Sequence, residues 1–177
     1  FAHWYTAYAD KPAFGLEGTE SLAENGILCV LVTMPGNLAV LDMDAAEGLC
    51  EKFPQIESWY MAGHSLGGSI AASYIAENSA DFDGVILLAS YSTADLTDHA
   101  LRVISLYGSE DGVLNAEKYV KYRDNLPEDT YENVLEGGCH AYFGAYGTQD
   151  GDGTPTVTAW EQIQWTVEEI RRMLWTF

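Results

Sequence analysis

The segment Trp59-Tyr60-Met61-Ala62-Gly63-His64-Ser65-Leu66-Gly67-Gly68 decides the fold. An apolar run leads into the pattern G-x-S-x-G, and small, helix-compatible residues follow as far as Ala76. This order predicts a strand, a sharp turn and a helix, with Ser65 at the turn. Gly63 and Gly67 have no Cβ atom, so the strand and the helix can approach closely. The turn would lift the Ser65 hydroxyl clear of the sheet and aim the first N–H groups of the helix at the same space.

Further apolar runs on both sides of this segment predict a parallel sheet. Residues 27–33, 84–90 and 103–108 are continuously apolar rather than alternating, which is typical of strands that are covered on both faces. Residues 130–136 form a more polar run, and we expect this strand near an edge. With the strand before Ser65, the sequence predicts five strands.

Apolar residues at helical spacing predict helices between these strands. Gly26 is a candidate C-cap, Asn115 a candidate N-cap, and Thr158 with Glu161 a capping box. We expect residues 1–20 to form an irregular, aromatic loop that leads into the first helix. The expected helices cover residues 19–24, 37–53, 66–78, 115–125 and 159–174.

Alternating strands and helices predict an α/β protein with a doubly wound, mainly parallel sheet flanked by helices. The length of 177 residues suits a single domain over residues 1–177. Phe1 is not an initiator Met, so the sequence is compatible with a domain that is truncated at its N-terminus. No stretch between strands is long enough for a large lid domain, so we expect a minimal version of the fold.

The charge balance limits the partners of the protein. The chain has 8 Lys and Arg against 27 Asp and Glu, a net charge of −19. Such a field repels phosphate backbones and anionic membrane surfaces, so nucleic-acid partners are not expected. No apolar run approaches the about 18 residues of a membrane span, so membrane insertion of this chain is not expected either. The sequence is compatible with any oligomeric state, with a cytoplasmic location and, if the parent protein has an N-terminal anchor, with an extracytoplasmic one.

Three residue types of a hydrolytic triad follow the carboxyl ends of predicted strands. A serine hydroxyl needs a base to take its proton, and the base needs a carboxylate to orient it. In an open parallel sheet, such groups meet beyond the carboxyl ends of the strands. Ser65 follows one predicted strand, Asp111 follows the strand over 103–108, and His140 follows the strand over 130–136. The chain order Ser, Asp, His is the order used by α/β-hydrolases.

Other residues compete for these roles. Glu110 is a rival for the acid, although the following Gly112 and the strand end favour Asp111. Cys139, beside His140, is a rival nucleophile. The three cysteines do not suggest a disulfide scaffold. The rivals for the base are His3, His64 and His99.

A second pattern mimics a calcium-binding loop. Asp150, Asp152 and Thr154 alternate, and Glu161 lies eleven residues after Asp150. Pro155 stands where such a loop requires glycine, and Glu161 already has a predicted capping role. No metal and no organic cofactor is therefore expected.

The motifs at residues 63–68, 107–113 and 137–144 together resemble those of small bacterial α/β-hydrolases, which are distantly similar to dienelactone hydrolases. Residues 34–39 and the glycine-rich loop at 147–153 resemble that family as well, and the similarity covers about residues 20–177. The resemblance implies Ser65 as nucleophile, Asp111 as acid and His140 as base. True dienelactone hydrolases use a cysteine where this chain has Ser65.

The resemblance also implies where the oxyanion would be bound. The N–H of Leu66, directly after the nucleophile, would be one donor. Family members carry one more strand before the strand at 27–33, and the glycine-rich loop after it supplies a second donor; residues 1–5 contain no such glycines. Candidate pocket residues are Met34, Tyr142 and Phe143.

The predicted function is that of a carboxylesterase-like serine hydrolase. It would cleave small carboxylic esters through an acyl-enzyme intermediate on Ser65. Thioesterase or other acyl-transfer activity is an alternative within the same chemistry. A catalytically silent hydrolase fold that serves as a binding protein is the alternative from another class.

Overall fold

The computed structural model describes residues 2–5, 15–32, 41–42, 44–144 and 147–175. Within these residues six parallel strands form one sheet in the order β2-β1-β3-β4-β5-β6. The chain adds β2 on one side of β1 and then adds β3 to β6 on the other side. This change of direction makes the sheet doubly wound, as predicted. The strands are β1 (Ala2–Tyr5), β2 (Cys29–Leu31), β3 (Tyr60–His64), β4 (Gly84–Leu88), β5 (Arg102–Gly108) and β6 (Tyr131–Leu135).

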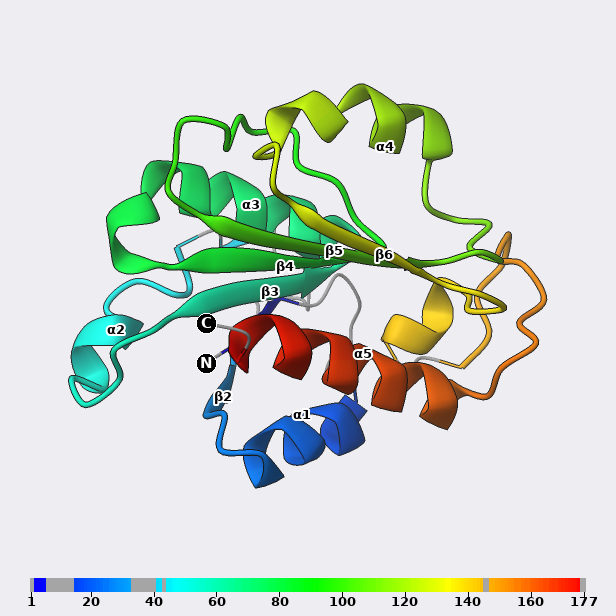
Figure 1. Ribbon diagram of the computed structural model, residues 1–177, viewed down its shortest axis with the longest axis horizontal. Coiled ribbons are helices and arrows are strands. Elements are labelled where there is room, and N and C mark those ends of the chain that lie inside the picture. The colour runs from blue at the N-terminus through cyan, green and yellow to red at the C-terminus, as the bar shows by residue number, and fades with distance from the viewer. Residues whose placement is uncertain (1, 6–14, 33–40, 43, 145–146, 176–177) are drawn as a thin grey trace.

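Helices cover both faces of the sheet (Figure 1). Helices α1 and α5 lie on one face, while α3 and α4 lie on the other. The helices are α1 (Gly15–Glu24), α2 (Leu49–Lys52), α3 (Leu66–Glu77), α4 (Ala116–Lys121) and α5 (Ala159–Trp175), and the 3-10 turns are η3 (Ser79–Asp81), η4 (Arg123–Asn125) and η5 (Ala141–Phe143).

The two cores explain why the central strands are continuously apolar. Successive side chains of a strand point to opposite faces. In β4, Ile86 and Leu88 pack into the core beneath α5, whereas Val85 and Leu87 pack into the core beneath α3. All four side chains are fully buried. The prediction of a parallel sheet covered on both faces is therefore confirmed for the central strands.

The first strand corrects the prediction of an irregular loop at the N-terminus. Residues Ala2–Tyr5 form β1, which lies between β2 and β3 and pairs with both. The strand that the family carries before residues 27–33 is thus present. Its loop, from residue 6 to residue 14, lies outside the described residues.

Two further predictions were partly wrong. The run at 27–33 forms only the short edge strand β2, and Leu31 is 40% exposed, so this strand is not covered on both faces. The helix expected over 37–53 is, in its described part, only α2. Gly48 has a φ of 69°, and this left-handed residue interrupts the helical backbone directly before α2. Residues 33–40 and 43 lie outside the described residues.

Most local signals were correct. Gly26 has a φ of 81° just beyond α1, and the side chain of Asn115 accepts a hydrogen bond from the Lys118 N–H at the start of α4. Thr158 and Glu161 form the reciprocal bonds of a capping box before α5. Helix α1 begins at Gly15, earlier than predicted. No described helix is long and apolar enough to cross a membrane.

Candidate active site

Ser65 lies at a strained turn between β3 and α3. Its φ of 54° and ψ of −127° are unusual for a residue with a side chain, and two contacts hold it there. The Ser65 N–H donates to the carbonyl of Leu88 at 2.9 Å, and the buried hydroxyl of Ser90 donates to the carbonyl of Ser65 at 2.6 Å. Both partners come from the end of β4, so the neighbouring strand fixes the turn.

Glycines are required on both sides of the serine. A Cβ atom on Gly63 would lie 2.5 Å from the main chain of Gly67, and one on Gly68 would lie 2.6 Å from the Oγ of Ser90. Such contacts are too short for any side chain, which confirms the predicted close approach of strand and helix. The first turn of α3 therefore begins directly beside Ser65.

Asp111 follows the carboxyl end of β5 and is held by the main chain of its own loop. Its Oδ1 accepts hydrogen bonds from the N–H groups of Val113 at 2.9 Å and Leu114 at 2.7 Å. These bonds fix the plane of the carboxyl group. Its Oδ2 lies 2.8 Å from Nδ1 of His140.

His140 follows the carboxyl end of β6, immediately before η5. Its side chain and that of Asp111 are each only 2% exposed. A carboxylate can only accept, so Nδ1 carries the shared proton and Nε2 of the neutral ring is left with its lone pair. Nε2 is buried and has no hydrogen-bond partner among the described residues.

A cavity of about 180 Å³ brings Ser65 and His140 together at the carboxyl edge of the sheet. The half-exposed side chain of Leu66 is part of its wall. The remaining wall comes from the turns after β4 and β5 and from α3: Ser69, Ala89, Ser90, Tyr91, Val113, Leu114 and Asn115.

The predicted pocket residues are not part of this wall. Phe143 is fully buried in the core beneath α5, and Tyr142 does not line the cavity. Met34 lies outside the described residues. Tyr91, Val113 and Leu114 were not predicted, because turn residues carry no pattern that reveals which cavity they face.

His64 and His99 do not line the cavity. The ring of His64 is fully buried with its centroid 4.5 Å from that of His140, and burial and the neighbouring His140 lower its pKa well below the ordinary value. His99 lies at the opposite edge of the sheet, and the side chain of His3 is not described. Of the described histidine side chains, only His140 lines the cavity with Ser65.

Cys139 is a poor rival for the role of nucleophile. Its side chain is buried, and burial raises the pKa of the thiol to about 11. At neutral pH the thiol is therefore protonated and weakly nucleophilic. The residue does not line the cavity with His140.

Asp152 is a residue of the site that the sequence did not assign to it. Its carboxylate accepts hydrogen bonds from the N–H groups of Gly112, His140 and Ala141. The calcium pattern would need this same carboxylate and that of Glu161, which caps α5. No cluster of three or more metal-binding side chains occurs within the described residues.

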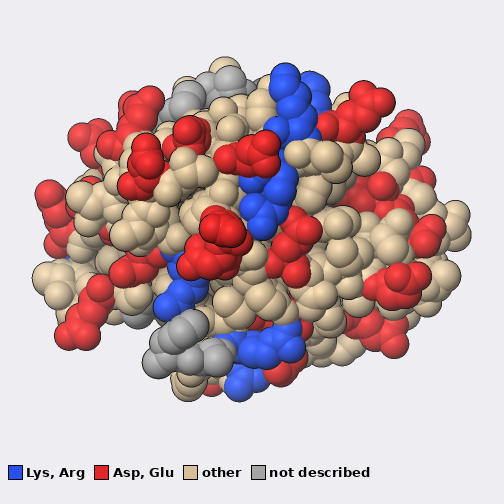
Figure 2. All heavy atoms as spheres, turned by 45° about the horizontal axis from the view of Figure 1, so that its top comes forward, with Lys and Arg blue, Asp and Glu red and all other residues tan. Residues whose placement is uncertain are grey.

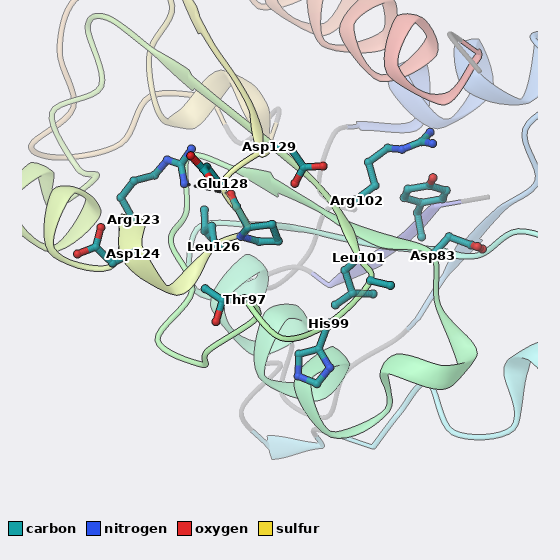
Figure 3. A pocket seen from close by; sticks show the side chains of 13 residues that line it. Asp83, Thr97, His99, Leu101, Arg102, Arg123, Asp124, Leu126, Glu128 and Asp129 are labelled. Atoms are coloured by element: carbon teal, nitrogen blue, oxygen red, sulfur yellow. Dashed lines mark hydrogen bonds between the residues drawn. The ribbon is translucent and has the colours of Figure 1, made fainter.

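A much larger hollow lies at the opposite, amino edge of the sheet (Figure 3). It has a volume of about 1160 Å³ and is lined by residues that begin or precede strands, among them Asp83, Arg102 and Asp129. None of Ser65, Asp111 and His140 belongs to it. The smaller cavity is the one that Ser65 and His140 line, so the candidate site is not the larger hollow.

Comparisons with known proteins agree with the observed fold. A family profile described as "Alpha/beta hydrolase family" matches residues 4–164. No curated protein sequence gives a significant match.

Solved structures resemble the fold over nearly the whole chain. Est1E from Butyrivibrio proteoclasticus has a TM-score of 0.70 at 12% identity, and the match covers 98% of this chain and 87% of that one. XC6422 from Xanthomonas campestris, described as an α/β serine hydrolase without lid, has a TM-score of 0.64 at 12% identity and coverages of 97% and 82%. The Paleococcus ferrophilus monoacylglycerol lipase has a TM-score of 0.65 at 12% identity and coverages of 95% and 94%.

Proposed function

Because this chain belongs to the alpha/beta hydrolase family, we propose that it is a serine hydrolase that cleaves small carboxylic esters. The observation that carries this proposal is the buried pair of Asp111 and His140. Nε2 of His140 has no hydrogen-bond partner among the described residues, and His140 lines the same cavity as Ser65. Such a pair supplies a base beside an alcohol on a strained turn.

The proposed reaction has two halves. In the first, Oγ of Ser65 bonds to the ester carbonyl carbon while its proton passes to Nε2 of His140. The C–O bond to the alcohol then breaks, and His140 returns the proton to the leaving alkoxide. In the second half, water attacks the acyl carbon while one of its protons passes to Nε2 of His140. The bond between the acyl carbon and Oγ of Ser65 then breaks, and His140 returns the proton to Oγ, which releases the acid and restores the hydroxyl. Asp111 stabilises the imidazolium in both halves.

The N–H of Leu66 is the proposed oxyanion donor. Leu66 is the first residue of α3, and the N–H groups of a first turn have no acceptor within the helix. The positive end of the helix dipole favours negative charge at the same point. A second donor would come from the loop after β1, which lies outside the described residues.

Labelling with a fluorophosphonate tests the proposal. We expect the native protein to form one covalent adduct, and peptide mass spectrometry to locate it on Ser65. Heat-denatured protein is the control, because an unactivated serine reacts negligibly. No adduct on the folded native protein would favour the silent binding fold instead.

The size and charge of the site predict short, uncharged acyl groups. A cavity of about 180 Å³ has room for a short chain, and Asp and Glu are spread over the surface in Figure 2 on a chain of net charge −19. We expect kcat/KM for p-nitrophenyl acetate or butyrate to exceed that for the dodecanoate at least about 10-fold, since each methylene that does not fit costs about 1–3 kcal/mol. A preference for the long chain would contradict the assignment of this cavity to the acyl group.

A further inference from the structure

The carboxylate of Asp152 joins the loop of the acid to the loop of the base. Its Oδ1 accepts from the N–H of Gly112 at 3.1 Å and from the N–H of His140 at 3.1 Å. Its Oδ2 accepts from the N–H of Ala141 at 2.9 Å. Gly112 directly follows Asp111, and Ala141 directly follows His140, so one side chain bridges the loops that hold the proposed acid and the proposed base.

The main chain around Asp152 is packed directly against the acid loop. A Cβ atom on Gly153 would lie 2.0 Å from the carbonyl oxygen of Glu110, and one on Gly112 would lie 2.4 Å from that of Gly151. Because only glycines allow this approach, residues 151–153 pack against the main chain of Glu110 and Gly112, on both sides of Asp111. The carboxylate of Asp152 then links this packed segment to the main chain of His140.

Asp152 is an anion at neutral pH. Although burial acts in the opposite direction, the N–H groups of Ala141, His140 and Gly112 hold its pKa below the ordinary value. Hydrogen bonds to an ionised acceptor are stronger than those to a neutral one. The three N–H groups from the two loops therefore share one charged acceptor.

We infer that Asp152 is a positioning residue, which fixes the separation and orientation of Asp111 and His140 through main-chain N–H groups of both loops. The inference rests on the proposed function and adds a fourth side chain to it. Asp152 does not line the cavity with Ser65, so it acts through His140 rather than on substrate.

The general attachment of the base loop to the core is provided elsewhere. The buried side chain of Gln162 on α5 accepts from the N–H of Cys139 at 3.0 Å and donates to its carbonyl at 2.8 Å. Loss of the Asp152 carboxylate would therefore leave the loop of His140 attached to α5 through Gln162. It would remove only the hydrogen bonds that link this loop to the loop of Asp111.

The substitution Asp152→Asn tests the inference. The amide oxygen can replace one carboxylate oxygen, but the amide NH2 must then face an N–H donor. We expect kcat and the rate of fluorophosphonate labelling to fall about 10- to 100-fold, as small displacements of catalytic groups do, with KM changed less than about twofold. Asp150→Asn is the matched control, because Asp150 is exposed in the same loop and loses the same charge. Its kcat should equal that of the native protein.

A double-mutant cycle separates positioning from a general loss of stability. If Asp152 acts through His140, then Asp152→Asn should slow labelling of the His140→Ala variant less than about twofold. A native kcat for a folded Asp152→Asn, or an equal loss in both backgrounds, would overturn the inference. If circular dichroism finds Asp152→Asn unfolded, Asp152→Glu is measured instead, with kcat expected to fall about tenfold. Failure of both variants to fold would assign Asp152 a structural role and also overturn the inference.

Failure of the proposed function gives a different result. In that case the native protein itself would neither hydrolyse esters nor take up the label, and all variants would behave alike. The inference about Asp152 is tested separately, because each result that overturns it is obtained with a native protein that does react.

Discussion

Replacing Ser65 by alanine is expected to lower kcat for p-nitrophenyl butyrate by about 10⁵- to 10⁶-fold. The reason is that the substitution removes the atom to which the acyl group bonds, while the cavity, the oxyanion donor and the Asp111–His140 pair remain. Fluorophosphonate labelling should disappear. Initial rates at high enzyme concentration, with the contaminating esterase activity of the host subtracted, measure the effect.

Ser73→Ala is the matched control for this experiment. Ser73 lies on the same helix, two turns after Ser65, and its hydroxyl donates to the carbonyl of Ser69 at 3.0 Å, outside the cavity. The same atom is removed, and kcat should change less than about threefold because the interaction is a single hydrogen bond. If Ser65→Ala still hydrolyses the ester and takes up the label at native rates, then Ser65 is not the nucleophile.

The turn at Ser65 could be predicted because several local rules agree there. The apolar run, the glycines and the helix-compatible residues all concern neighbours in the chain, and a sharp strand-to-helix turn satisfies each of them. The pairing of Asp111 with His140 was predictable for a related reason. Both residues follow strand ends, and in a parallel sheet these ends meet at one edge.

Strand β1 could not be predicted from its residues. The segment Ala2–Tyr5 is four residues long and contains His3, so it has neither the length nor the apolar pattern of an interior strand. Its stability comes from pairing on both sides, since Ala2 is in register with Cys29 and with Tyr60. Such partners are distant in sequence, and tertiary pairing overrides weak local preference.

Asp152 eluded prediction because its partners are main-chain groups. The sequence drew attention to this residue in a calcium-like spacing with Asp150 and Glu161 and in the glycine-rich loop at 147–153, and neither pattern assigned a role to its carboxylate. A bond from a side chain to a distant N–H leaves no pattern in residue types. The glycine directly after it, Gly153, was the available sign that another segment of main chain approaches closely there.

Asp111→Asn is expected to lower kcat by about 10⁴-fold with little change in KM. The argument depends on which way the new amide faces. The N–H groups of Val113 and Leu114 donate to Oδ1, so the amide oxygen of asparagine will take that position. The amide NH2 then occupies the position of Oδ2, 2.8 Å from Nδ1 of His140.

An amide NH2 at that position presents a donor to Nδ1 in place of the nearer acceptor, and the remaining acceptor, at the Oδ1 position, is 3.1 Å from Nδ1 and already accepts from two N–H groups. The substitution therefore favours the tautomer with the ring proton on Nε2. In this tautomer His140 has no lone pair toward Ser65 and cannot accept its proton. Glu110→Gln is the matched control, because Glu110 is exposed on the same loop and undergoes the same carboxylate-to-amide change without contact to His140. It should retain kcat within about twofold, since changes at exposed sites away from such contacts are small. If Glu110→Gln is the variant that loses activity and Asp111→Asn retains it, then the acid of the pair has been assigned to the wrong residue.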